Sequence, residues 1–498
     1  MKTGQARGLF VEESAPRTTG AGSLVRCLFE PAVRADPYPL LERIRDHGPV
    51  WPDDDVVVFS SCEHCAAVLR SAAAVPTSAT GTTGQPRGHG TVPVPPAERH
   101  RHRHRHRHQH RHVLTAPVVT PVITPVVTPV VTSVVTSVVT SVVTPEVLAL
   151  LGPCVRELID DLLDSVAARG RLEVVTDLAY PLPVALVCRL FGLTEVDQVW
   201  LRRRLMPSAR VWEPHRALLG TEPPGHDEQL RAESELDDFF GDVAARRGTD
   251  LGDGLLAPTL AGLSADVRPS ADETWAWCRA LLLGALESTA DLLSNSVLSL
   301  LRAPHEQESI RRRPDRAAAV VEEVLRTDPP VQVLQRTARE DLDVCGVHVP
   351  KGTTMVLLVA AAHRDPRCLT VPGPGRTGPG PDLGIGHTGL GHTGLGAGHD
   401  LGRGLGSGLG SGRAPGHDLG LVGHSCTGAP TARLMARQLL VRFAQRVERP
   451  RFATGTPTYR PNVALRGLRA LWVDADGFGG RAQPWAPRDV RTPHNGFL

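Results

Sequence analysis

Apolar residues recur three and four positions apart through much of the chain, and this spacing predicts helices that each bury one face. The clearest such stretches are residues 36–51, 62–71, 145–170, 177–193, 227–247, 271–301, 315–330 and 429–446. Shorter apolar runs bounded by Gly, Pro or Ser predict strands at 55–61, on both sides of the turn at 350–352, and as a pair within 458–473. We therefore expect a mainly α-helical protein with a small β region.

Two stretches of the chain show neither the apolar spacing of a helix nor the short apolar runs of strands. Residues from about 76 to 145 hold an alternating His/Arg tract and then a four-residue Val/Thr repeat, while about 370–416 is Gly-rich with repeated GHTGL units. Pro117, Pro121, Pro125 and Pro129 recur every fourth residue, so the Val/Thr repeat cannot form a membrane-spanning helix despite its apolar content. The prediction is a disordered N-terminus (1–21) and one domain over 22–498, interrupted by these two insertions.

Composition narrows the classes of function. The chain has 498 residues, 41% of them hydrophobic, which is enough for a large core. Its formal net charge is only +2, so there is no electrostatic case for nucleic acid or an anionic membrane surface. The N-terminal residues contain no apolar run of signal-peptide length, and of nine cysteines only Cys62 and Cys65 lie close together. We expect a cytoplasmic protein with thiols rather than a disulfide framework, acting on a small molecule.

Cys426 is a candidate metal ligand. It lies in the loop GLVGHSCTGAP, directly before a predicted helix, with His424 two residues earlier. Backbone N–H groups and the positive end of a helix dipole stabilise a thiolate there, and His424 can hold a carboxylate of a bound cofactor. Taken alone, a buried structural cysteine is the more common explanation.

Two helices upstream carry further candidates. Gly284 and Ala285 are small residues inside the long apolar helix, and the acid Glu287 and the hydroxyl of Ser288 follow them. A hydrogen bond from Ser288 to the Gly284 carbonyl would open a local helix distortion where a small molecule fits. The pair Glu323 and Arg326, three residues apart, would contribute only about 0.2–0.5 kcal/mol if it were exposed.

The order of these features, a small-small-x-acid-hydroxyl run, then Glu-x-x-Arg, then a His-x-Cys-x-Gly loop that opens a helix, resembles the cytochrome P-450 superfamily. The resemblance to soluble actinobacterial members covers nearly the whole chain outside the two insertions. It implies the P-450 fold and one haem b whose iron is bound by the Cys426 thiolate. It also implies a monomeric monooxygenase that uses O2, with electrons from NAD(P)H through a ferredoxin and a ferredoxin reductase, on a small hydrophobic substrate.

The resemblance assigns roles residue by residue. It implies that Glu287, Ser288 and the adjacent Thr289 deliver protons to dioxygen. It also implies that Glu323 and Arg326 are buried residues with a structural role. The residues implied to contact haem are Cys426, His424, Arg336, Gly420 and Gly428, together with His100 and Arg103 at the start of the His/Arg tract. An apolar substrate pocket would be lined by Leu282, Ala285, Leu286, Val331, Val333, Leu334, Val463 and Ala464.

The ligand loop departs from the family pattern. That pattern usually reads Phe-Gly-x-Gly-x-His-x-Cys, whereas this chain has Leu419 and Val422 among the residues before Gly423. A positive φ at Val422 would cost on the order of 1–3 kcal/mol. Ser288 stands where the family usually has Thr, so it keeps the hydroxyl but lacks the methyl that restricts the rotamer.

Two other functions stay open on the sequence alone. One is a degenerate haem-binding homologue without monooxygenase activity, and the other is a metal-binding protein whose imidazoles lie in the His/Arg tract. The spacing of Cys62 and Cys65 also fits half a zinc site or a redox dithiol, although no second Cys pair accompanies it and a short helix there should bury at least one of the two.

The Val/Thr repeat offers a first test. Deleting residues 120–144 should leave haem incorporation intact, because a stretch with Pro at every fourth position has little periodic apolar surface to bury. The measurement is the haem absorbance per protein after purification. A deletion variant that is insoluble or lacks haem would show that the repeat belongs to the core.

Overall fold

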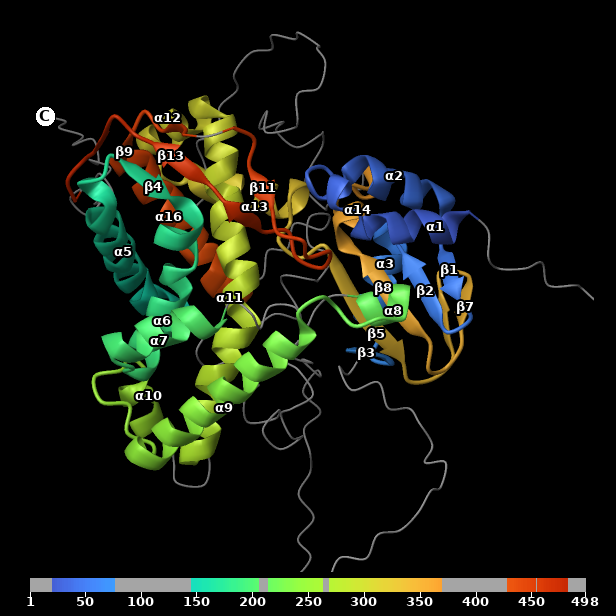
Figure 1. Cartoon of the computed structure of the whole chain (residues 1–498), viewed down its shortest axis with the longest axis horizontal. Helices are drawn as coiled ribbons and strands as arrows, with labels where there is room; N and C mark the ends of the chain where they lie inside the picture. The colour runs from blue at the N-terminus through green and yellow to red at the C-terminus, as the bar shows by residue number, and fades with distance from the viewer. Residues whose placement is uncertain are drawn as a thin grey trace, which may run out of the picture.

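In a computed structural model of the chain, the structure describes residues 20–76, 145–205, 214–262, 268–369, 428–453 and 455–481. The predicted insertions fall almost wholly outside these ranges. Figure 1 shows a sheet with short N-terminal helices at one side of the molecule, most of the longer helices at the other, and the long helix α11 between them.

One five-stranded sheet organises the first side. Its order is β1-β2-β8-β5-β3, with β2 and β8 parallel and the other neighbours antiparallel. The strands are β1 (Val50–Asp53), β2 (Val56–Phe59), β3 (Ala74–Pro76), β5 (Val333–Ala338) and β8 (Thr354–Leu358). A hairpin of β6 (Leu342–Val344) and β7 (Val347–Val349) precedes β8. The strands predicted on the two sides of the 350–352 turn are β7 and β8.

Both faces of this sheet are buried, which explains why β2 is a continuous apolar run. Val56 and Val58 pack in one hydrophobic cluster, while Val57 and Phe59 pack in another, because successive side chains of a strand point to opposite faces. The helices beside the sheet are short: α1 (Ala21–Arg26), η1 (Cys27–Phe29), η2 (Pro31–Arg34), α2 (Tyr38–His47), α3 (Cys62–Arg70), α8 (His215–Leu219), α14 (Val359–His363) and α15 (Pro366–Leu369).

The helical side forms the largest hydrophobic cluster around α11 (Ala271–Arg302). A capping box of Ser270 and Glu273 begins this helix, which contacts η3, α6, α9, α12, α13 and α16. The other helices on this side are α5 (Pro145–Ala167), η3 (Val174–Ala179), α6 (Pro181–Phe191), α7 (Glu195–Leu205), α9 (His226–Arg247), α10 (Ala257–Ala261), α12 (Pro304–Arg312), α13 (Arg316–Thr327) and α16 (Ala429–Arg446). The predicted helices are thus confirmed in type.

The helix predicted over 177–193 is in fact two elements. A π-helical turn, η3, precedes α6, and Glu173 caps it by accepting hydrogen bonds from Val175 N at 3.3 Å and Thr176 N at 2.6 Å. The Glu173 carboxylate also accepts from Leu471 N at 2.6 Å, so a local cap joins distant parts of the chain. Residues 174–191 are apolar and long enough to cross a membrane, but 78% of this stretch is buried inside the protein.

Short strands close the domain near the C-terminus. β4 (Arg171–Glu173), β10 (Arg451–Phe452) and β13 (Trp472–Asp474) form a three-stranded sheet. β9 (Val447–Glu448) pairs with β14 (Gly477–Phe478), and β11 (Thr458–Tyr459) pairs with β12 (Leu468–Ala470). The last pair confirms the two strands predicted within 458–473.

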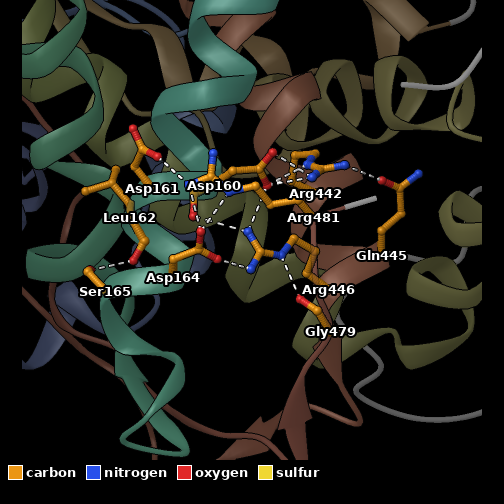
Figure 2. Close-up of polar contacts among 10 residues, drawn as sticks. All are labelled: Asp160, Asp161, Leu162, Asp164, Ser165, Arg442, Gln445, Arg446, Gly479 and Arg481. Carbon is orange, nitrogen blue, oxygen red and sulfur yellow. Dashed lines mark hydrogen bonds and ion pairs between the residues drawn. The ribbon is translucent and has the colours of Figure 1, made fainter. Parts of the chain in front are cut away.

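Buried ion pairs fix helix α16 against α5 (Figure 2). Arg442 donates to Asp160 Oδ1 from Nη2 at 2.6 Å, and Arg446 Nη1 lies 2.9 Å from the same oxygen. All three side chains are almost fully buried. Arg446 also pairs with Asp164 and donates to the Gly479 carbonyl at 2.9 Å, so the network holds α5, α16 and the C-terminal segment together.

Asp160→Asn should destabilise the protein by about 3–5 kcal/mol, because it leaves two buried guanidiniums without their shared charge partner. Asp161→Asn is the matched control on the same helix: its half-exposed side chain meets Arg481 at 2.7 Å, and its loss should cost less than about 1 kcal/mol. The free energy of unfolding from urea titrations measures both. Equal effects of the two substitutions would contradict the assignment of α16 anchoring to Asp160.

Candidate functional site

The described chain resumes two residues after Cys426, at the start of helix α16. Gly428 is the N-cap of this helix, no acidic residue lies in its first turn, and Pro430 occupies one of its first positions. The N-terminal end of an 18-residue helix therefore follows the cysteine directly, which favours a negative charge there. Cys426, His424 and Gly420 themselves, like His100 and Arg103, lie outside the described residues.

Helix α11 presents one open position in its middle. Gly284 is exposed although it lies inside a long core helix, and Ser288, one turn later on the same face, is half-buried. Thr289 and Glu287 are buried on either side of it. The acid and the hydroxyl thus occupy neighbouring faces, about 100° apart around the helix.

The local distortion predicted at Ser288 is absent from the described residues. α11 is a continuous α-helix from Ala271 to Arg302, and the Ser288 hydroxyl has no hydrogen bond to the Gly284 carbonyl. Tertiary packing on several sides keeps the helix regular, so the hydroxyl remains available to a ligand. The opening at this point comes from the missing side chain of Gly284 and not from the backbone.

Glu287 is held in a buried cluster with partners that the sequence did not indicate. Tyr180, which follows η3, donates its hydroxyl hydrogen to the Glu287 carboxylate. Arg460, which follows β11, pairs with Glu287 and also with Asp291, one turn further along α11. Asp291 could have been noticed as a second acid at helical spacing from Glu287, whereas nothing local marks Tyr180 or Arg460.

Arg336 on β5 is a buried cation without a carboxylate. It is only 6% exposed, and its guanidinium donates to the neighbouring Gln335 carbonyl at 2.8 Å. No carboxylate of the described residues pairs with it, and burial lowers its pKa below the usual value. Since a buried charge is costly unless it is compensated, this position suits an anionic group that the polypeptide does not supply.

Glu323 and Arg326 form a local ion pair on α13, with Arg326 Nε 2.9 Å and Nη2 2.5 Å from the two carboxylate oxygens. Both side chains are half-buried rather than fully buried. The preceding Glu322 was missed by the sequence analysis: it pairs with Arg433 at 2.9 Å and Arg437 at 3.1 Å, both on α16. The Glu-Glu-x-x-Arg segment therefore joins α13 to the helix that follows Cys426.

Comparison with known proteins gives a consistent result. The family model for cytochrome P-450 matches residues 317–372. The biotin biosynthesis cytochrome P-450 of Bacillus subtilis (strain 168) is 29% identical over 326 residues, 64% of this chain and 72% of that protein. The 6-deoxyerythronolide B hydroxylase of Saccharopolyspora erythraea is 31% identical over 216 residues, 43% of this chain and 51% of the relative. The crystal structure of Mycobacterium smegmatis CYP164A2 with econazole bound matches with a TM-score of 0.65 and 31% identity, covering 91% of this chain and 100% of that one.

The chain belongs to the cytochrome P-450 family. Its fold is the mainly α P-450 fold with a small β region, as predicted, and the family consists of oxidoreductases that use haem iron and O2. The described residues fit a haem: Arg336 offers an unpaired buried cation to a propionate, and the Gly284–Ser288 face of α11 is open. Gly428 and α16 lie on the chain directly after the thiolate candidate.

The P-450 pocket predicted from the sequence is only partly assembled. Val333, Val463 and Ala464 lie in one hydrophobic cluster, where Ala464 O accepts hydrogen bonds from Gln332 N at 2.7 Å and Val333 N at 3.4 Å. Leu334 faces the opposite side of the sheet, in the cluster against which Val331 packs. Of Ala285 the structure describes only the helical backbone.

Leu282 and Leu286 lie on other sides of α11 than Ser288. Both are buried in the helical core, in the cluster that surrounds α11. At 100° per residue they lie about 120° and 160° around the helix from Ser288, so they cannot share its open face.

The Cys62–Cys65 pair is not one site. Cys62 is disulfide-bonded, whereas Cys65 is a free and fully buried thiol whose Sγ donates to Phe59 O at 3.5 Å. Burial raises the pKa of Cys65 far above its usual value, so it remains protonated. Both Cys62 and Cys65 pack in one hydrophobic cluster, consistent with the expectation that at least one faces the core. The described residues hold no cluster of His, Cys, Asp and Glu that fits a metal ion.

Ser288→Ala should keep haem and substrate binding but lower the product formed per NAD(P)H several-fold and raise hydrogen peroxide. This is less than the roughly 10²–10⁴-fold effect of losing a general acid, because water can substitute for the hydroxyl. Ser288→Thr should do the opposite, since the added methyl restricts the rotamer. The measurement is product and peroxide per NAD(P)H, with Thr289→Ala compared side by side. If only the Thr289 variant loses product, the assignment is wrong by one residue.

Proposed function

We propose that this cytochrome P-450 is a haem-thiolate monooxygenase that hydroxylates or epoxidises a small hydrophobic molecule of secondary metabolism in the cytoplasm. Cys426 is the proposed axial ligand, and the electrons come from NAD(P)H through a ferredoxin and its reductase. The observation that carries the proposal is the buried, unpaired guanidinium of Arg336, since haem brings two carboxylates into an apolar interior. Relatives named 6-deoxyerythronolide B hydroxylase and PikC support the reaction class and the secondary-metabolism setting.

The proposal gives separate tasks to the residues that would contact haem and to those beside the open face of α11. Haem supplies the reductive activation of dioxygen. Arg336, together with His424 and, at the start of the His/Arg tract, His100 and Arg103, neutralises the propionates by charge-assisted hydrogen bonds. The exposed Gly284 leaves space beside α11, and the Ser288 hydroxyl next to it donates a proton toward that space.

The apolar cluster of Val333, Val463 and Ala464 is the part of the predicted pocket that the proposal retains. These side chains come from β5 and from the segment between β11 and β12, and they bury apolar surface together. A pocket lined in this way selects for hydrophobic shape, with few polar groups to fix orientation. A polyketide, terpenoid, fatty acid or aromatic intermediate would meet this requirement.

The test is the absorption spectrum of the reduced protein under carbon monoxide. Wild-type protein should show the red-shifted band of thiolate-ligated haem, and Cys426→Ala should abolish it. Cys188→Ala is the matched control, because Cys188 is a buried thiol of α6 whose pKa burial raises to about 12. An unchanged band in the Cys426 variant, or a wild-type protein without haem, would overturn the proposed function.

A further inference from the structure

One buried carboxylate joins the first turns of α3 and α15. Asp365, which directly precedes α15, is 1% exposed, and its Oδ2 accepts a hydrogen bond from Cys62 N at 3.1 Å. Cys62 is the first residue of α3 and lies 303 positions earlier in the chain. The other oxygen, Oδ1, accepts from Arg367 N in the first turn of α15 at 3.1 Å. The N-terminal turns of two distant helices therefore share one side chain, and α3 and α15 are in contact.

This contact indicates the disulfide partner of Cys62. Of the nine cysteines in the chain, Cys62 is disulfide-bonded, and six others are free thiols: Cys27, Cys65, Cys154, Cys188, Cys278 and Cys345. The partner is therefore Cys368 or Cys426. Cys368 is the third residue of α15, three positions after the Asp365 that binds the Cys62 backbone. A disulfide needs Cα atoms about 4.4–6.8 Å apart, so the backbone arrangement favours Cys368.

The surroundings of Cys62 favour reduction of such a bond. When a disulfide is attacked at Cys368, the sulfur of Cys62 leaves as a thiolate at the first position of α3, where the helix N-terminus favours a negative charge. The charge of the nearby Asp365 is compensated by Arg367, whose Nη2 lies 2.8 Å from its Oδ2. A more stable leaving thiolate makes a disulfide easier to reduce.

The second cysteine of the CEHC segment cannot exchange with this bond. Cys65 is free and fully buried, three residues after Cys62, and burial raises the pKa of its thiol far above the usual value. Only a thiolate attacks a disulfide, so the protonated Cys65 leaves the bond of Cys62 intact. Reduction then requires an external dithiol, and the protein has two defined states, bonded and open.

Contacts lead from α15 to the helix that follows the haem-ligand candidate. Arg364, just before Asp365, donates from Nε to the Thr327 carbonyl at the end of α13, at 2.9 Å. Glu322 of the same helix pairs with Arg433 of α16 at 2.9 Å. α15 has only four residues, and the Gly-rich insertion begins directly after it, at about residue 370. A covalent anchor on α15 would therefore fix the end of the fold at which this insertion starts.

We propose that Cys62 and Cys368 form a reversible disulfide that fastens α15 to α3, and that reduction by a cytoplasmic dithiol protein loosens α15 and speeds the loss of haem. One thiolate of the reductant attacks the Cys368 sulfur, the disulfide breaks, and Cys62 leaves as a thiolate that takes up a proton. The second thiol of the reductant loses its proton and attacks the mixed disulfide, which releases Cys368 as a thiolate that is protonated in turn. Two electrons thus pass to the cysteine pair, and the reductant leaves as a disulfide.

The effect on haem rests on the proposed function, in which Cys426 binds the iron. The pairing itself does not depend on that function. It does, however, leave Cys426 outside any bond to Cys62, and an axial thiolate ligand must be free in this way.

Peptide mapping without reduction decides the pairing. The holoprotein is equilibrated with oxidised glutathione, unfolded and alkylated, and trypsin then releases Cys62 and Cys65 in peptide 46–70, Cys368 in 368–376 and Cys426 in 414–433. Peptide 46–70 should be linked to 368–376 and carry one alkyl group, on Cys65. A link from 46–70 to 414–433, or a peptide 46–70 alkylated on both cysteines, would overturn the proposal.

A second experiment compares haem retention in the two redox states. Wild-type holoprotein treated with dithiothreitol, then freed of it under argon, should unfold about 5 °C lower than the oxidised form. It should also transfer haem to apomyoglobin several-fold faster, because α15 no longer holds its position. Cys368→Ser should behave like reduced wild type before and after the treatment. An unchanged rate of haem transfer in reduced wild type would contradict the proposal, whatever the unfolding temperature.

Cys345→Ser is the matched control. Cys345 is an exposed free thiol in the turn between β6 and β7, so its loss should leave the difference between the two redox states as in wild type. Loss of that difference in this variant would assign the redox response to Cys345 and refute the proposed pair.

Reversibility is measured in glutathione buffers that span cytoplasmic ratios of reduced to oxidised glutathione. The link between peptides 46–70 and 368–376 should disappear in the more reducing buffers and return in the more oxidising ones. A link that none of these ratios opens would be a permanent crosslink, and the proposed switch would be wrong.

The proposed function and the disulfide fail separately. If wild-type protein lacks the thiolate-haem band, the proposed function falls, while the peptide map still decides the pairing of Cys62. If the band depends on Cys426 but peptide 46–70 is not linked to 368–376, the monooxygenase assignment stands and the disulfide pair is refuted.

Discussion

Burial of charge is the constraint on which the rest of this structure depends. An ionised group in the interior costs several kcal/mol unless a partner compensates it, so each buried guanidinium dictates which chain segments meet. Arg442 and Arg446 bring α5 to α16 through Asp160, and Arg466 brings the C-terminal segment to Asp328 after α13. These balanced pairs are the fixed frame of the domain.

Two places depart from that balance, and both lie where the proposed chemistry takes place. Arg336 has a buried positive charge that no carboxylate of the described residues compensates, and this suits the proposed propionate. On α11, Glu287 and Asp291 share the single guanidinium of Arg460. A frame of compensated pairs makes such departures meaningful, because an uncompensated charge in a well-packed interior persists only if a ligand or proton completes it.

The segment from β11 to β12 links the two halves of the molecule. Arg460 reaches α11 from it, while Val463 and Ala464 enter the core of the five-stranded sheet and Leu465 forms an isolated bridge with Val331. Asn295 of α11 donates to the Arg466 carbonyl at 3.0 Å, which fixes the same segment once more.

The sequence by itself determined most of the element types, the family and the identity of the motif residues. Helical periodicity predicted α5, α9, α11, α13 and α16, because apolar residues recur three and four positions apart along them, and the Glu-x-x-Arg and His-x-Cys-x-Gly patterns are local. Tertiary structure alone decided that Glu287 meets Arg460 and not Ser288, that Leu282 and Leu286 face the helical core, and that Cys62 is disulfide-bonded. Tyr180, Asp291 and Arg460 are separated by up to 280 residues, so no local pattern joins them. Their meeting is set by the packing of η3 and the β11–β12 hairpin on α11, which only the folded chain specifies.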